Sequence, residues 1–234
     1  MEILRDKDRD VLVGLALWST VGMLVIIPVQ IAVLTIWTLP SDATAWIEMF
    51  ATHPVVSVLH LDSLYAVNVA LLCVIYLGLF ALLAQDERGF ALVALVLGLV
   101  GAAAYFPTVR AIEIGRLSRI YAEAESPIFR EGVRAVIEGM ISVWKGTGYT
   151  AYYYLSAFSL LFFAIAMIRS AQFGRAISRL ALISALLMMI PATAGTVGMI
   201  FSLVSLIPWI AFLVLLVPKF RRHTAESSAP VEAQ

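Results

Sequence analysis

The longest uncharged stretch of the chain, residues 180–218, reads LALISALLMMIPATAGTVGMIFSLVSLIPWIAFLVLLVP. None of its 39 residues is Asp, Glu, Lys or Arg. As one helix it would measure about 58 Å, whereas the hydrocarbon core of a bilayer is about 30 Å thick. The stretch therefore predicts two membrane-spanning helices, and the helix-weakening segment Pro191–Gly198 marks where the chain turns between them.

Four further uncharged runs lie at Val11–Ser41, Ser63–Gln85, Gly89–Val109 and Gly146–Ile168. Each can supply the roughly 20 apolar residues that a span needs. The predicted fold class is all-α, a polytopic membrane bundle of six transmembrane helices in a single integral membrane domain, residues 1–222, with a disordered C-terminal tail, residues 223–234. The spans are expected at residues 11–37, 54–84, 90–109, 147–168, 180–198 and 201–217.

Composition limits the classes of function. Hydrophobic residues make up 62% of the chain, above the roughly 45–50% of soluble domains. Lys plus Arg and Asp plus Glu number 16 each, so no basic excess favours nucleic acid. The single cysteine, Cys73, excludes an intrachain disulfide. We expect a non-enzymatic protein with no cofactor and no metal, whose partners are membrane lipids; whether it forms a homo-oligomer stays open.

The distribution of basic residues orients the spans. With both termini on the cytoplasmic side, ten Lys and Arg residues lie inside and six outside, and all six belong to the third loop. The positive-inside rule favours this arrangement. The sequence therefore predicts a multi-pass plasma-membrane protein with cytoplasmic N- and C-termini.

The third loop is long, about 36 residues, where packed helices are usually joined by 2–8. Ser126 and Pro127 form a good helix start. The apolar residues that follow at helical spacing are Phe129, Val133, Val136, Ile137, Met140, Ile141 and Trp144. We predict an amphipathic helix over Pro127–Trp144 that lies on the outer leaflet or covers the end of the bundle.

Polar residues gather at the extracytoplasmic ends of the second, third and fourth predicted spans. Ionisable groups at membrane depth are costly and often mark a binding site. The candidate ligand-binding residues are His60, Asp62, Tyr65, Tyr105, Arg110, Glu113, Tyr149 and Tyr152. A plainer interpretation is also open: an ordinary ion pair at a helix end for Arg110 and Glu113, and interfacial polar residues for His60 and Asp62.

Aromatic and small residues add two structural expectations. Trp37, Trp46, Trp144 and the tyrosines 152–154 are typical of the belt that anchors helices at the head-group level. The pairs Gly98 with Ala102 and Ala194 with Gly198 are typical of close-packed helix faces.

The second half of the chain combines four features: the long third loop, a glycine- and aromatic-rich fourth span over Gly148–Phe163, the exit Ile168-Arg169-Ser170, and the approach Gly174–Leu182 to the fifth span. This order resembles the bacterial family of six-span membrane proteins called domain of unknown function 4386 (DUF4386). The resemblance covers Val11–Arg222 and consists of loose hydropathy patterns. It implies a bacterial plasma-membrane protein and carries over no catalytic residue.

Three functions remain. The first is binding of a lipid or small amphiphile in a polar pocket on the extracytoplasmic side. The second is a small transporter or channel-like accessory subunit, although the chain has no inverted repeat. The third is an intramembrane enzyme that uses Asp62, His60 or Glu113, although no HExxH or GxSxG motif is present.

Overall fold

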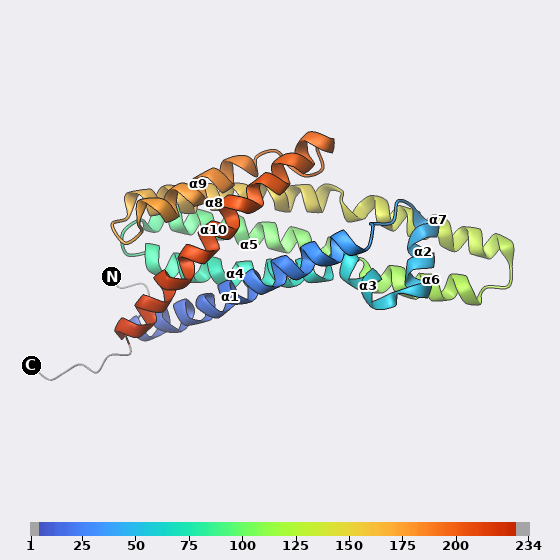
Figure 1. The fold of residues 1–234 in the computed structure, drawn as a ribbon, viewed down its shortest axis with the longest axis horizontal. Helices are drawn as coiled ribbons and strands as arrows, with labels where there is room; N and C mark the ends of the chain where they lie inside the picture. Colours follow the sequence, from blue (N-terminus) through green and yellow to red (C-terminus); the bar gives the residue numbers. More distant parts are fainter. Residues whose placement is uncertain (1–4, 228–234) are drawn as a thin grey trace, which may run out of the picture. The chain divides into compact units, whose positions relative to one another are not determined.

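The computed structural model describes residues 5–227, and within them the chain is all-helical (Figure 1). The chain folds into two compact units. The bundle unit comprises the described parts of residues 1–25, 69–102 and 152–234. The second, here called the tryptophan unit, comprises residues 26–68 and 103–151. Each unit is described by itself.

Five helical segments of the described residues are long and apolar enough to cross a membrane. They are Asp6–Ile36, Leu64–Leu83, Arg88–Glu123, Pro127–Arg169 and Gly195–Glu226. The chain is therefore a multi-pass helical membrane protein. The helices of these segments are α1 (Asp6–Ile36), α4 (Leu64–Leu83), α5 (Arg88–Tyr105), α6 (Ala111–Glu123), α7 (Pro127–Trp144), α8 (Thr147–Arg169) and α10 (Gly195–Ser227).

The helix predicted over residues 180–198 differs from the observed one. Helix α9 runs from Arg175 to Leu187 and has 13 residues, which corresponds to about 20 Å, short of a hydrocarbon core of about 30 Å. The turn lies at residues 188–194, because Pro191 disfavours helix in the residue before it and Gly195 adopts a φ of +67°. The chain folds back between α9 and α10 as predicted, but the turn comes earlier and α9 is not among the segments long and apolar enough to cross a membrane.

Other boundaries also differ. The second predicted span begins with α3 (Pro54–Val58) and a π-helical turn η1 (Leu59–Ser63) before α4. The third ends in a 3₁₀ turn, η2 (Phe106–Thr108), at Pro107. Helix α10 continues through Ser227, so the predicted disordered tail starts too early; residues 228–234 lie outside the described part.

Small residues let the helices of the bundle unit pack closely. A Cβ on Gly98 would overlap the ring of Tyr76 and lie 2.8 Å from Ser159 Oγ, and the Ser159 hydroxyl donates to the carbonyl of Ala94 at 2.7 Å. The close-packing role predicted for Gly98 is confirmed. Ala194 and Gly198 instead close the turn before α10, because a Cβ on Gly198 would overlap the Pro191 carbonyl oxygen.

Polar contacts fasten one end of the bundle unit. Arg169 Nε at the end of α8 donates to both carboxylate oxygens of Glu87 at 2.9 Å. Ser170 Oγ donates to Asp86 Oδ2 at 2.6 Å. His223 Nε2 of α10 lies 3.2 Å from Asp10 Oδ1 of α1. The first turns of α1 and the last turns of α10 therefore lie together.

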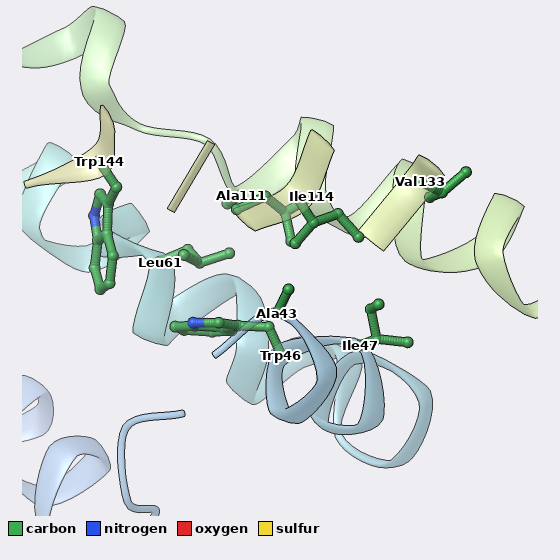
Figure 2. Packing of buried hydrophobic residues seen from close by; sticks show 9 residues of the cluster. Ala43, Trp46, Ile47, Leu61, Ala111, Ile114, Val133 and Trp144 are labelled. Atoms are coloured by element: carbon green, nitrogen blue, oxygen red, sulfur yellow. The ribbon is translucent and has the colours of Figure 1, made fainter. Parts of the chain in front are cut away.

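The tryptophan unit is built from short helices around an apolar core. Helix α2 (Ala43–Thr52) has Asp42 as its N-cap, and Asp42 Oδ1 accepts a hydrogen bond from Ala45 N at 3.0 Å. This hydrogen bond lowers the pKa of the Asp42 carboxyl. The core consists of Ala43, Trp46, Ile47, Leu61, Ala111, Ile114, Val133, Ile137 and Trp144. Figure 2 shows Ala43, Trp46 and Ile47 of α2 facing Ala111 and Ile114 of α6.

The amphipathic helix predicted over Pro127–Trp144 is confirmed as α7, with Ser126 as its N-cap. Val133 and Ile137 are buried in the core. Glu138 Oε2 accepts from Ala43 N at 3.1 Å and ties α7 to the start of α2. The belt expected of Trp46 and Trp144 is wrong: both are buried, with ring centroids 5.8 Å apart in an edge-to-face arrangement.

Candidate functional site

Three of the predicted site residues form an aromatic cluster in the tryptophan unit. Tyr65 of α4 lies 5.3 Å from Tyr105 at the end of α5 and 6.5 Å from Tyr149 at the start of α8, measured between ring centroids. Tyr105 and Tyr149 are 6.4 Å apart. These are separations at which aromatic pairs attract each other. The three rings, here called the tyrosine cluster, therefore lie together, and their role in binding a ligand stays a prediction.

A glycine makes this convergence sterically feasible. A Cβ on Gly148 would lie 2.8 Å from the carbonyl oxygen of Ala104 and 2.7 Å from Thr108 Cγ2. Any larger residue would push the first turn of α8 away from the end of α5. The place of Tyr149 next to Tyr105 thus depends on Gly148.

His60 lies in the π-helical turn η1 and is 2% exposed. Neither Nδ1 nor Nε2 forms a hydrogen bond of good geometry with the described residues. Burial lowers the pKa of His60 below its usual value, and the backbone of Trp37 acts weakly in the opposite direction. His60 is therefore a neutral imidazole with hydrogen-bonding capacity to spare, in a type of turn that is frequent at functional sites.

Two further buried polar groups lie in the same unit. Asn68 is 8% exposed, and its Nδ2 donates to Gln30 Oε1 of α1 at 2.9 Å. Asn68 Oδ1 and the indole Nε1 of Trp46 have no hydrogen-bond partner among the described residues. Buried polar atoms are normally paired, so each such atom needs an explanation.

The candidate residues chosen from the sequence leave out Gln30, Trp46 and Asn68, although Asn68 lies among the polar residues at the start of the second predicted span. Gln30 had a usable signal, because it is the single amide in the apolar run Val11–Ser41. Trp46 had none, since a tryptophan close to a predicted span is typical of the aromatic belt.

The remaining candidates are Arg110, Glu113, Tyr152 and Asp62. Arg110 Nη1 and Glu113 Oε1 are 3.4 Å apart, with side chains 31% and 43% exposed. Exposed pairs of this kind contribute about 0–1 kcal/mol, which fits the plainer interpretation of a helix-end ion pair. Tyr152 belongs to the bundle unit, where it acts electrostatically on Tyr76. Asp62 lies in η1, and its side chain is outside the described part.

The described residues contain no group of three or more His, Cys, Asp or Glu side chains that could hold a metal ion. The polar and aromatic groups described above in the tryptophan unit are uncharged: the tyrosine rings, the His60 imidazole, the Asn68 amide oxygen and the Trp46 indole N–H. Such a set can hold an apolar body and hydrogen-bond a polar tip.

No protein family, curated protein or solved structure matches the chain. The resemblance to DUF4386 therefore has no support from a family match.

Proposed function

We propose that this membrane protein binds a lipid or small amphiphile in the tryptophan unit, without catalysing a reaction. The observation that carries the proposal is His60, which is 2% exposed and whose ring nitrogens form no hydrogen bond of good geometry with the described residues. Leaving a buried polar group unpaired costs about 1–3 kcal/mol. A bound molecule that supplies the missing hydrogen bond removes this cost. The half-buried rings of Tyr65 and Tyr149 offer apolar surface for such a molecule in the same unit, and both rings pack on the fully buried ring of Tyr105.

The binding test compares the lipid content of the wild type with that of three variants. The protein is purified in mild detergent, and the lipid that remains is extracted and quantified by mass spectrometry per mole of protein. We expect His60→Phe to retain at least fivefold less of one lipid species than the wild type, because Phe fills the space but forms no hydrogen bond. The matched control is His53→Phe, since His53 is exposed. His60→Gln, which keeps a donor and an acceptor, should retain part of the lipid. Equal lipid content in wild type and His60→Phe would overturn the proposal.

The proposed topology has six crossings, with both termini in the cytoplasm and with the first and third predicted loops and the last hairpin turn outside. The contact of 3.2 Å between Asp10 and His223 supports an even number of crossings, because it joins the start of α1 to the end of α10. Five segments are long enough to cross. The sixth crossing would consist of α9 with the turn after it, since non-helical backbone is tolerated at membrane depth where protein covers it. Basic residues lie near the end of the bundle unit where Arg169 contacts Glu87, and the positive-inside rule supports a cytoplasmic location for that end.

Cysteine labelling tests this topology. In a Cys73→Ser background, single cysteines replace the exposed residues Thr44, Glu125, Ala171 and Glu226, and intact cells are treated with an impermeant maleimide. We expect labelling at positions 44 and 125, and protection at 171 and 226 until the membrane is opened. If α9 does not complete a crossing, position 226 labels from outside while position 171 stays protected.

A further inference from the structure

We propose that the site at His60 takes an uncharged, hydroxyl-bearing head group, so that the ligand is an amphiphilic alcohol such as a diacylglycerol or a long-chain alcohol. This inference rests on the proposed binding function and adds the chemical class of the ligand. It starts from the hydrogen-bonding groups that the tryptophan unit leaves unpaired.

These groups are neutral and match a hydroxyl. A neutral imidazole has one donor and one acceptor, and a hydroxyl offers one donor and two acceptor lone pairs. His60 can therefore both give a hydrogen bond to an alcohol and receive one from it. The same unit also contains an unpaired donor, Trp46 Nε1, and an unpaired acceptor, Asn68 Oδ1, both uncharged. Within the described residues, burial and the Trp37 backbone are the influences on the His60 pKa, and no charged group is among them.

Four of the six basic side chains of the unit have partners, and the other two, Arg116 and Arg119 of α6, are exposed. Arg110 pairs with Glu113, Arg134 pairs with Glu131 at 2.6 Å, and Arg130 Nε donates to the Ala124 carbonyl at 2.7 Å. Lys145 Nζ lies 4.6 Å from the centre of the Trp144 ring. A phosphate at His60 would have to lose its water without gaining a buried cation, which is strongly unfavourable. An uncharged alcohol loses far less on leaving water.

The experiment uses two lipids with the same acyl chains. Dioleoylglycerol and dioleoylphosphatidic acid are titrated separately into delipidated full-length protein in detergent, and the bound fraction is measured by native mass spectrometry. We expect dioleoylglycerol to bind at least tenfold more tightly to the wild type. The preference should disappear in His60→Phe and persist in part in His60→Gln. Melting temperatures of all variants show whether each is folded.

The outcomes separate the two proposals. If phosphatidic acid binds as tightly as diacylglycerol or more so, and its binding falls in His60→Phe, the head-group class is wrong and the binding function stands. If neither lipid depends on His60 while His60→Phe is folded, a buried water satisfies the imidazole and the proposed function fails with this inference.

Discussion

Replacing Ile137 by Asp should unfold the tryptophan unit while the protein stays in the membrane. Ile137 is fully buried in α7, within the core that includes Trp46 and Trp144. Truncating a buried isoleucine to alanine costs about 2–5 kcal/mol, and an unpaired carboxylate at the same place costs more. A small unit has little stability to lose. Limited proteolysis of membranes should therefore cleave the variant rapidly between residues 122 and 146, where the wild type resists.

Val136 provides the matched control because it is the neighbouring residue on the same helix and is 49% exposed. Val136→Asp places the same charge on an exposed face and should change stability by about 0.5 kcal/mol or less. Equal cleavage of both variants would show that α7 does not pack on a core. Rapid cleavage of the wild type would lead to the same conclusion.

The second large effect is expected in the bundle unit, where Gly78→Ala should destabilise. A Cβ at Gly78 would overlap the Cβ of Ala16 in α1 and lie 3.4 Å from the Leu12 carbonyl oxygen. The Ala16 methyl is fixed to its backbone, so the two helices must separate. Overpacking of this kind costs about 1–3 kcal/mol. The sign of the stability change distinguishes a close contact from open space, because Gly→Ala inside a helix otherwise stabilises by about 1 kcal/mol.

The measurement is the melting temperature in detergent, followed by tryptophan fluorescence. Gly89→Ala is the control, since nothing lies within 4 Å of a Cβ there, and it should be neutral or stabilising. The double change Ala16→Gly with Gly78→Ala moves the methyl from one helix to the other and should restore most of the loss. A neutral Gly78→Ala, or a double variant no better than the single, would contradict the close approach of α1 and α4.

The sequence predicts well those elements that obey one strong constraint. Uncharged runs of about 20 residues must span or be buried, so five long helical segments were foreseeable. Helix α7 was predictable to the residue because Ser126 and Pro127 mark its start and apolar residues recur at helical spacing. The turn before α10 was misplaced because the uncharged stretch gives no boundary. Pro191 was recognised as helix-weakening, but the predicted helix was carried on to residue 198, whereas α9 ends at Leu187.

The candidate site was predictable in its aromatic part only. Tyr65, Tyr105 and Tyr149 fall at the same ends of three predicted spans, so their meeting followed from the alternating direction of the helices. The pairing of Gln30 with Asn68 depends on which faces of α1 and α4 meet, and one sequence does not specify those faces. The core of the tryptophan unit joins α2, α6 and α7, whose contacts are between segments far apart in the chain. Trp46 was therefore assigned to the membrane interface instead of to a core.

The contact between Asp10 and His223 also bears on how the protein is made. Helix α1 leaves the ribosome before α10, about 210 residues earlier, so at roughly 5–20 residues per second α1 waits about 10–40 s for its neighbour. Phe220 of α10 is fully buried, with its Cζ 3.7 Å from where a Cβ of Gly78 would lie. During biosynthesis that surface of α1 and α4 must be covered by lipid or by the insertion machinery. The bundle unit is therefore completed only when α10 has been made and packs against α1 and α4.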